Sequence, residues 1–285
     1  IEFDSSRLFL IDLAFNSHEA IPTRLLHRFN VQLASAPSPS LPSSLSYTGA
    51  SLPLTSKILT ISPPLEGKGW IAINGCCAPD VGHRSTGLPV NGEIHFAQRF
   101  ALDWVQMDAQ GRVVNGDVSK IKNYVGYGAK VLAVAEGTVV DILNSLPEQT
   151  PPNDPDPGTI NLQNVLGNHV ILDLENHVFA LYAHLQTGSV TVKPGVRVGR
   201  GQVLGKLGNT GNTSAPHLHF HLMNGPTLGS EGLPYEMNFN FAGQIPVTTY
   251  NTSFPEVNWK EYLLPQPSAR RDEFPLYLNI VDFPE

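Results

Sequence analysis

The sequence predicts a mainly β protein, and three features indicate this class. Its 285 residues include 25 glycines and 24 prolines, which are spread along the chain and separate short apolar runs. Such punctuation is typical of short strands joined by turns. Residues 99–107 alternate between apolar and polar side chains, and residues 130–142 form a run rich in β-branched residues, which favours strands. We therefore expect an antiparallel β-sheet core.

The composition excludes several classes of protein. Hydrophobic residues make up 41% of the chain and charged residues 15%, which excludes a disordered acidic chain. Lys and Arg number 18 against 25 Asp and Glu, giving a net charge of −7, and this is not the basic footprint of a nucleic-acid binder. No apolar run approaches the roughly 18 residues of a membrane-spanning helix. The chain starts at Ile1 without a basic and apolar leader, so we expect any targeting peptide to be absent or already removed.

The first part of the chain, residues 1–64, predicts a small β-rich appendage and linker. It contains apolar stretches at 8–15 and 25–33, a Ser- and Pro-rich segment at 35–46, and a further short apolar run at 58–61 before Pro63 and Pro64. We expect the appendage to be completed by a C-terminal strand at 276–281.

The middle of the chain, residues 65–235, predicts the main domain. A strand at 70–74 ends at Gly75, and alternation in 99–107 places Leu102 and Trp104 toward the core and Asp103 on the opposite face. The run at 130–142 has Gly137 where a bend would fall. Five prolines in residues 144–162 exclude a helix or a paired strand, so this segment is a loop. Further strands are expected at 169–174, 178–182, 189–193, 202–207 and 217–223. Residues 236–285 predict a C-terminal extension that packs on the N-terminal part.

Three histidines alternate in the strand at 217–223, at positions 217, 219 and 221. Alternate residues of a strand share one face, so these imidazoles project together, which suits a metal ligand with a neighbouring imidazole. The alternative is a solvated polar face. Upstream, His184 ends an apolar strand just before a polar turn, where it is either catalytic or a hydrogen-bonded structural residue. Asp103 is either part of the same site or the partner of Arg99 in a salt bridge.

The two cysteines, Cys76 and Cys77, are neighbours. Two thiols are too few for a disulfide framework or a structural zinc site. We expect two half-buried thiols, with a disulfide between the neighbours as the alternative.

Residues 70–225 resemble the lysostaphin-type zinc endopeptidases of family M23. The resemblance rests on segments that occur in the family's order: Asp103-Trp104, residues 127–139, Gly167-Asn168-His169-Val170, Tyr182-Ala183-His184-Leu185, Gly201-Gln202-Val203-Leu204-Gly205, and residues 211–220 with His217-Leu218-His219. It implies one Zn²⁺ per chain with Asp103 and His219 as ligands, and His184 and His217 as unligated catalytic histidines. It also implies that His217 takes the proton from water and His184 stabilises the oxyanion.

The first zinc ligand departs from the family pattern. The usual histidine four residues before the aspartate is Arg99 here, and arginine has no lone pair to donate. Two upstream histidines remain, His83 and His95. We favour His83, because its loop can fold over Asp103, whereas a strand starting near Ala97 would separate His95 from Asp103. His95 stays the alternative. His221 is expected to support the site from outside, and His169 and His177 to be structural or exposed.

The resemblance implies a zinc metalloendopeptidase in an extracellular or periplasmic location. It would act on a peptide or on peptidoglycan, and residues 144–162 and 76–97 would wall its groove. The alternative is an M23-like binding or regulatory module without activity. Residues 192–204 also resemble half of a biotinyl- or lipoyl-carrier domain, but they lack a lysine on a tight hairpin. The sequence does not indicate the oligomeric state.

Overall fold

The computed structural model describes residues 13, 15, 21–32, 43–53, 58–77, 81–253 and 258–284. They belong to two compact units, Ile1–Ile58 and Leu59–Glu285. In the first unit, β1 (Arg24–Leu25) pairs with β4 (Leu52–Pro53), and β2 (Arg28–Gln32) pairs with β3 (Ser44–Thr48). Most of the predicted stretch 8–15 and of the Ser- and Pro-rich segment 35–46 lies outside the described residues.

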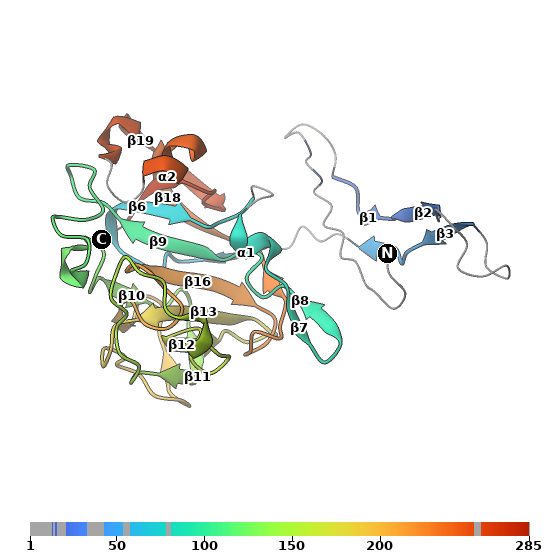
Figure 1. The fold of residues 1–285 in the computed structure, drawn as a ribbon, viewed down its shortest axis with the longest axis horizontal. Coiled ribbons are helices and arrows are strands. Elements are labelled where there is room, and N and C mark those ends of the chain that lie inside the picture. The colour runs from blue at the N-terminus through green and yellow to red at the C-terminus, as the bar shows by residue number, and fades with distance from the viewer. Residues whose placement is uncertain are drawn as a thin grey trace. The chain divides into compact units, whose positions relative to one another are not determined.

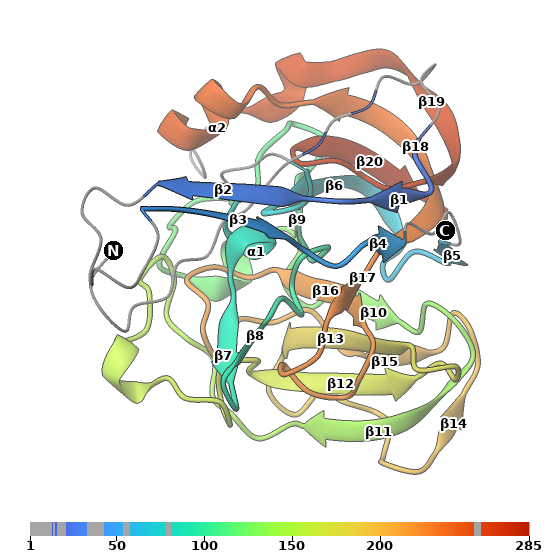
Figure 2. The same cartoon turned by 90° about the vertical axis from the view of Figure 1, so that its right-hand side faces the viewer.

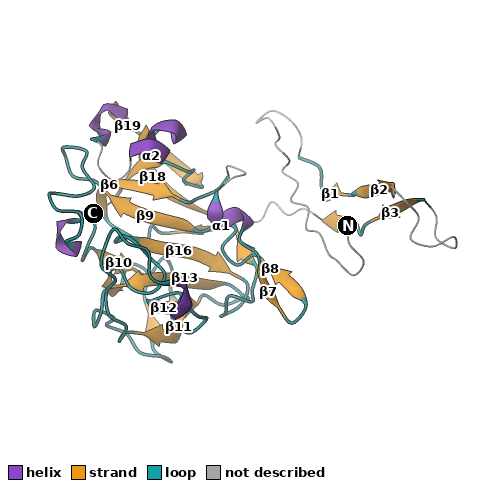
Figure 3. Cartoon of the chain, viewed as in Figure 1, coloured by secondary structure: helices purple, strands orange, loops and turns teal. Residues whose placement is uncertain are grey.

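The second unit is built on a twelve-stranded sheet, which confirms the predicted mainly β class (Figures 1 and 3). Its strands lie in the order β14-β11-β12-β13-β16-β9-β6-β20-β18-β19, with β17 paired to β16 and β5 paired to β18. Among the described strands of this sheet, every pairing is antiparallel except that of β5 with β18. The bounds are β5 (Leu59–Ile61), β6 (Gly67–Ile73), β9 (Leu102–Gln106), β11 (Gly137–Leu143), β12 (Asn168–Asp173), β13 (Phe179–Leu185), β14 (Arg197–Val198), β16 (Leu218–Met223), β17 (Gly232–Leu233), β18 (Tyr235–Gln244), β19 (Leu263–Glu273) and β20 (Asn279–Phe283).

Shorter elements surround this sheet (Figure 2). Strands β7 (Leu88–Val90) and β8 (Glu93–His95) form a hairpin, and β10 (Lys130–Leu132) pairs with β15 (Val203–Lys206). The helices are short: α1 (Gly82–Ser85), α2 (Val247–Ser253), and the 3₁₀ turns η1 (Ile121–Asn123), η2 (Pro157–Thr159) and η3 (Trp259–Tyr262). Within the described part of the chain, every helix falls short of the length and apolarity needed to cross a membrane.

The two faces of the sheet are distinguished by strand alternation. Leu102 and Trp104 of β9 are fully buried in the largest apolar cluster, as the alternation in 99–107 predicts. That cluster also includes Val131 of β10 and Leu204 of β15. Val105, on the opposite face of β9, belongs to a second apolar cluster. The second cluster includes residues of β6, β18 and β20 and is joined by Tyr124 and Trp259 from the connecting segments. This cluster covers the face that bears Asp103 over β6, β18 and β20. On the same face, Ile171, Leu181, Ala183 and Met223 of β12, β13 and β16 form a third buried cluster, against which Leu166 packs.

The predicted domain division differs from the structure at both ends. The two units meet at Ile58 and Leu59, not at residues 64 and 65, because β5 already pairs with β18. Residues 236–285, predicted to form an extension on the N-terminal part, instead supply most of β18 and all of β19 and β20 to the main sheet. The predicted strand at 276–281 corresponds to β20, which lies between β6 and β18. The predicted strand at 189–193 is irregular.

The prediction of two free thiols is also corrected. Cys76 and Cys77 form a disulfide with each other, and the peptide bond that joins them is cis. Cys76 is buried and Cys77 is exposed. Arg84 donates to the carbonyl of Cys77 at 2.7 Å, and the backbone N–H of Tyr277 donates to the carbonyl of Cys76 at 3.0 Å. These bonds tie the cysteine pair to α1 and to the segment before β20.

Candidate functional site

A buried carboxylate and an imidazole meet across two neighbouring strands. The register of β9 and β16 places Asp103 directly opposite His219, and both side chains point to the face opposite Leu102 and Trp104. His219 Nδ1 lies 2.9 Å from Asp103 Oδ1, and the two residues are only 3% and 4% exposed. A buried charge of this kind needs close partners to compensate its lost hydration.

His83 completes a three-residue cluster from outside the sheet. It lies in α1, and its Nε2 is 3.5 Å from Asp103 Oδ2. Its ring also stands edge-on to the ring of His219, with centroids 4.7 Å apart. One donor atom each from His83, Asp103 and His219 can be chosen so that all three lie within 4.8 Å of one another. Two imidazoles and one carboxylate are a donor set that suits Zn²⁺.

His184 reaches the same face because its strand contains a bulge. Tyr182 pairs with Val170 and Leu185 pairs with Asn168, so β13 advances three residues while β12 advances two. His184 has a positive φ of 61°, which is uncommon for a residue other than glycine. Strict alternation would turn His184 to the side of Tyr182, in the core, but a bulge re-aims the side chain. Its Nδ1 lies 2.8 Å from the carbonyl oxygen of Thr210, to which it donates.

His217 immediately precedes β16 and lies next to His184. Their ring centroids are 4.7 Å apart. His217 donates from Nδ1 to the carbonyl oxygen of Ala215 at 2.8 Å, and its Nε2 is 3.5 Å from Asp103 Oδ1. In both histidines the carbonyl contact holds the proton on Nδ1, so each neutral ring carries its lone pair on Nε2.

His221 is fully buried behind His219. Its Nδ1 lies 3.0 Å from His219 Nε2, and its own Nε2 has no hydrogen-bond partner among the described residues. If His219 uses its Nδ1 lone pair toward a metal, its proton sits on Nε2 and is donated to His221. Contacts of this type fix the tautomer of a metal-binding imidazole.

Asn74 is a residue of the site that the sequence analysis missed. Its Nδ2 donates to Asp103 Oδ2 at 2.8 Å, and its φ is 54°. An Asn-Gly pair after a strand predicts a turn with a positive φ, and that was the available signal. Nothing local in the sequence indicates that the turn lies beside Asp103.

Burial and the neighbouring charges shift the pKa values of several groups of the site. Desolvation lowers the pKa of His83 to about 4, against the opposing effect of Asp103. Burial, reinforced by neighbouring imidazoles, also holds the pKa values of His184 and His221 well below the ordinary histidine value. Burial alone would raise the pKa of Asp103, but the surrounding histidines outweigh it and hold this pKa well below its usual range. Neutral imidazoles and an ionised carboxylate are the forms that bind a metal.

The other predicted candidates lie apart from this cluster. His95 lies in β8, where its Nδ1 is 3.1 Å from Glu231 Oε1. Arg99, the alternative partner of Asp103, has its guanidinium over the ring of Phe96 at 5.1 Å. His169 is buried, with its Nε2 3.3 Å from Asp141 Oδ2, and His177 is exposed.

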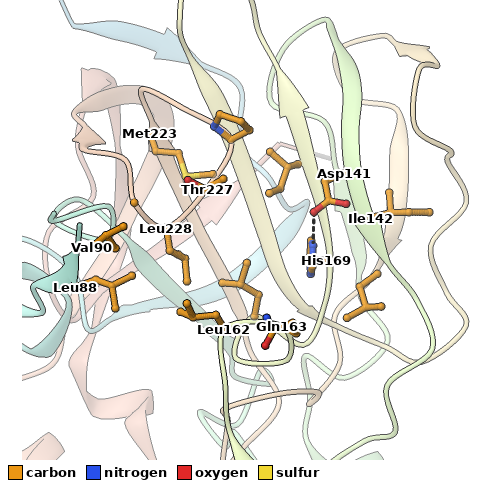
Figure 4. Close-up of a pocket in the computed structure, with 15 residues that line it drawn as sticks. Leu88, Val90, Asp141, Ile142, Leu162, Gln163, His169, Met223, Thr227 and Leu228 are labelled. Atoms are coloured by element: carbon orange, nitrogen blue, oxygen red, sulfur yellow. Dashed lines mark hydrogen bonds and ion pairs between the residues drawn. The ribbon is translucent and has the colours of Figure 1, made fainter. Parts of the chain in front are cut away.

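Two pockets of about 480 and 380 Å³ share Leu88, Leu162 and Leu228. Leu88 belongs to 76–97 and Leu162 to 144–162, the two segments predicted to wall the groove of the site. However, neither Asp103 nor any of His83, His184, His217 and His219 lines either pocket. The proline-rich loop is fixed at its start by Glu148, whose carboxylate accepts from the backbone N–H groups of Thr187 and Asn209 at 2.9 and 2.7 Å. Figure 4 shows the larger pocket.

Comparison with known proteins gives the following matches. Residues 119–229 match the family model described as Peptidase family M23; this range contains His184, His217 and His219, and it begins after His83 and Asp103. Peptidoglycan DD-endopeptidase ShyA of Vibrio cholerae is 42% identical over 57 residues, which cover 20% of this chain. Peptidoglycan DD-endopeptidase ShyC of the same organism is 45% identical over 60 residues, or 21% of this chain. The matched segment covers only 13% of the length of each relative.

Two solved structures of similar proteins are the catalytic domain of lysostaphin from Staphylococcus simulans and a zinc-containing peptidase from Vibrio cholerae. The match to the lysostaphin domain has 25% sequence identity and a TM-score of 0.30, and it covers 51% of this chain and 80% of the lysostaphin domain. The match to the zinc-containing peptidase has 19% sequence identity and a TM-score of 0.27, and it covers 50% of this chain and 51% of the peptidase.

Proposed function

Because this chain contains a domain of peptidase family M23, we propose that it is a zinc-dependent endopeptidase that hydrolyses peptide bonds in peptidoglycan cross-links or bridges. One observation carries the proposal: the His83, Asp103 and His219 cluster lies directly beside His184 and His217, which both direct Nδ1 to a carbonyl oxygen and so leave Nε2 toward the cluster as the nitrogen with the lone pair in the neutral ring. A metal site with adjacent bases is what metal-assisted hydrolysis requires.

The residues present fit a zinc ion. The donor atoms are two imidazole nitrogens and a carboxylate oxygen, and Asn74 and His221 form hydrogen bonds to Asp103 and His219, respectively. Three protein ligands leave a position open, as is usual in catalytic zinc sites. Zinc in such a site lowers the pKa of water and polarises the carbonyl of the peptide bond.

His217 and His184 have different roles in this proposal. His217 accepts the proton of the attacking water at Nε2, because that nitrogen carries a lone pair and is near Asp103 Oδ1. Once protonated, a ring can donate from Nε2 to the leaving amine or to the oxygen of the tetrahedral intermediate. His184 is adjacent and is held in place by Thr210, so it is positioned to stabilise the developing oxyanion.

The proposed substrate and the proposed location are supported by different observations. Both curated relatives are named for action on peptidoglycan, and this supports a peptidoglycan peptide as substrate. The Cys76–Cys77 disulfide supports an oxidising compartment such as the periplasm or the extracellular space.

The test is digestion of purified peptidoglycan and its cross-linked muropeptides by the full chain, with products identified by mass spectrometry. We expect new amino termini, one zinc per chain by elemental analysis, loss of cleavage with a chelator, and recovery with Zn²⁺. A zinc-loaded protein that binds muropeptides but cleaves none would instead support the inactive binding module.

A further inference from the structure

Resting on this proposed function, we propose that Thr213 is a positioning residue for the catalytic histidine His217. Thr213 lies in the glycine-rich segment 208–216, before β16, and is buried. Its hydroxyl oxygen Oγ1 lies 3.2 Å from His217 Nδ1. This oxygen is a second acceptor for the Nδ1 proton, beside the carbonyl oxygen of Ala215. The two acceptors together hold the ring in the orientation that proton transfer needs.

The direction of the Thr213 hydroxyl follows from its neighbours. Oγ1 has one proton to donate and two lone pairs, and it lies 2.8 Å from Asn209 Oδ1 and 2.9 Å from the carbonyl oxygen of Ala215. The Ala215 carbonyl already accepts the Nδ1 proton of His217 at 2.8 Å. The hydroxyl proton therefore goes to Asn209, by the shorter contact, and a lone pair of Oγ1 is left for His217.

The side-chain amide of Asn209 is fixed in one orientation. Asn209 is fully buried, and its Nδ2 donates to the carbonyl oxygen of Gln149 at 3.1 Å. The reverse orientation would bring Oδ1 against that carbonyl, and two acceptors with no proton between them cannot bond. Oδ1 therefore faces Thr213 as an acceptor.

Hydrogen bonds connect His217 to the start of the proline-rich loop. The backbone N–H of Asn209 donates to Glu148 Oε2 at 2.7 Å, and its carbonyl accepts from the N–H of Gln149 at 2.7 Å. Asn209 in turn orients Thr213, which contacts His217. Because a buried polar network whose members have partners is rigid, the loop start defines the position of the Thr213 hydroxyl.

A second acceptor matters because the reacting nitrogen is at the other end of the ring. Nε2 of His217 lies 3.5 Å from Asp103 Oδ1, so a tilt of the ring about Nδ1 displaces Nε2 from the metal cluster. One hydrogen bond to Ala215 permits such a tilt, and a second acceptor on the same N–H restricts it. A misplacement of about 1 Å can cost about 100-fold in rate, so this restriction should be visible in kcat.

The first test is the pair of variants Thr213→Val and Thr213→Ser. Valine keeps the branched shape without the hydroxyl, and we expect it to lower kcat by about tenfold, the weight of one hydrogen bond. KM should stay within about twofold, because the buried hydroxyl contacts His217 rather than the substrate, and zinc content should be unchanged. Serine keeps Oγ and should restore kcat to within about threefold.

Thr191→Val is the matched control. The hydroxyl of Thr191 also donates to a backbone carbonyl, that of Val203, at 2.9 Å, and its contact does not involve a histidine. This variant should retain the kcat and KM of the unmodified protein. An unchanged kcat in Thr213→Val, or a loss that Thr213→Ser does not restore, would overturn the positioning role.

A double-variant cycle separates positioning from a general loss of structure. Thr213→Val is combined with His217→Ala, and kcat is measured for both single variants and the double variant with zinc bound. If Thr213 acts through His217, the double variant should match His217→Ala within about twofold. A further loss of about tenfold in that background would make the two effects independent and would overturn the proposal.

Nuclear magnetic resonance of protein with isotope-labelled histidine rings tests the contact without catalysis. The signals of His217 are identified by their loss in His217→Ala. The Nδ1 proton of His217 should exchange with water about tenfold faster in zinc-loaded Thr213→Val than in the unmodified protein. This result with no cleavage of any muropeptide would overturn the endopeptidase and retain Thr213 as the residue that orients His217. Equal exchange rates with cleavage intact would overturn the role of Thr213 and leave the endopeptidase standing.

Discussion

His184 and His217 come from different segments, yet their rings lie 4.7 Å apart and each donates its Nδ1 proton to a carbonyl of the same loop. The acceptors, Thr210 and Ala215, are five residues apart in the glycine-rich segment before β16. This loop therefore fixes the tautomer of both histidines at once. Because both Nε2 atoms are left as acceptors, either ring can take a proton, and the ring that does becomes a donor.

Replacing His217 should separate catalysis from metal binding. We expect His217→Ala to keep one zinc per chain and to lower kcat by about 10²- to 10⁴-fold, the usual contribution of general acid–base catalysis. His184→Ala should do the same, whereas Asp103→Ala and His219→Ala should lose the metal. The measurements are elemental analysis and steady-state kinetics on one preparation. Loss of zinc from His217→Ala would move this residue into the ligand set.

The third ligand can be identified by a pair of histidine variants. We expect His83→Ala to lose zinc and activity together, because His83 contacts Asp103 and His219. His95→Ala should keep both, because its ring contacts Glu231 instead. A zinc titration of the two proteins with a competing chelator is the measurement, and the reverse pattern would assign the ligand role to His95.

His221 should affect zinc affinity through its contact with His219 and should not contact the substrate. We expect His221→Ala to weaken zinc binding by about 10- to 100-fold, the usual effect of removing a partner of a ligating imidazole. At saturating zinc its kcat should remain close to that of the unmodified protein. His169→Ala, a buried histidine that pairs with Asp141, is the control. Unchanged zinc affinity in His221→Ala would reduce His221 to a packing residue.

The segments near the site were predictable where strand alternation holds. Leu102 and Trp104 lie in the core and Asp103 lies opposite, and the alternation of His217, His219 and His221 likewise places them on one face. The position of His184 could not be derived this way, because the bulge in β13 breaks the alternation at that residue. The contact of Asn74 with Asp103 and the place of β20 in the main sheet were missed for another reason. Their partners are distant in the sequence, and local pattern carries no information on long-range pairing.

The C-terminal segment should be essential to the stability of the second unit. Ile280 of β20 is fully buried beside Ile71 of β6, so Ile280→Ala should lower the free energy of unfolding by about 2–5 kcal/mol. Leu276→Ala, at a position that is 51% exposed, should change it by less than about 0.5 kcal/mol. Urea unfolding followed by tryptophan fluorescence makes the comparison. Equal stability of the two variants would indicate that residues 276–283 are dispensable to the sheet.

Asp108, which lies outside the histidine cluster, makes a pH-dependent contribution to the free energy of unfolding. Its slight burial would raise its pKa, but hydrogen bonds from Arg112 and from the N–H of Gln110 hold the pKa below the ordinary 3.8. A lowered pKa in the folded state stabilises the protein above the unfolded value, and this stabilisation is lost as the pH falls through the folded value. Asp108→Asn should therefore cost about 1 kcal/mol at pH 7 and progressively less below about pH 4. A difference in unfolding free energy that stays constant with pH would exclude this role.

The position of β20 has a consequence for biosynthesis. All the histidines of the site leave the ribosome before residues 279–283, which fill the gap between β6 and β18. At about 5–20 residues per second, the delay from His221 to Phe283 is about 3–12 s. During that time the backbone groups of β6 that will bind β20 have no partner, and an open strand edge invites pairing with other chains. The sheet therefore stays incomplete while the last residues are synthesised, and the protection of the nascent chain from aggregation depends on how quickly β20 arrives.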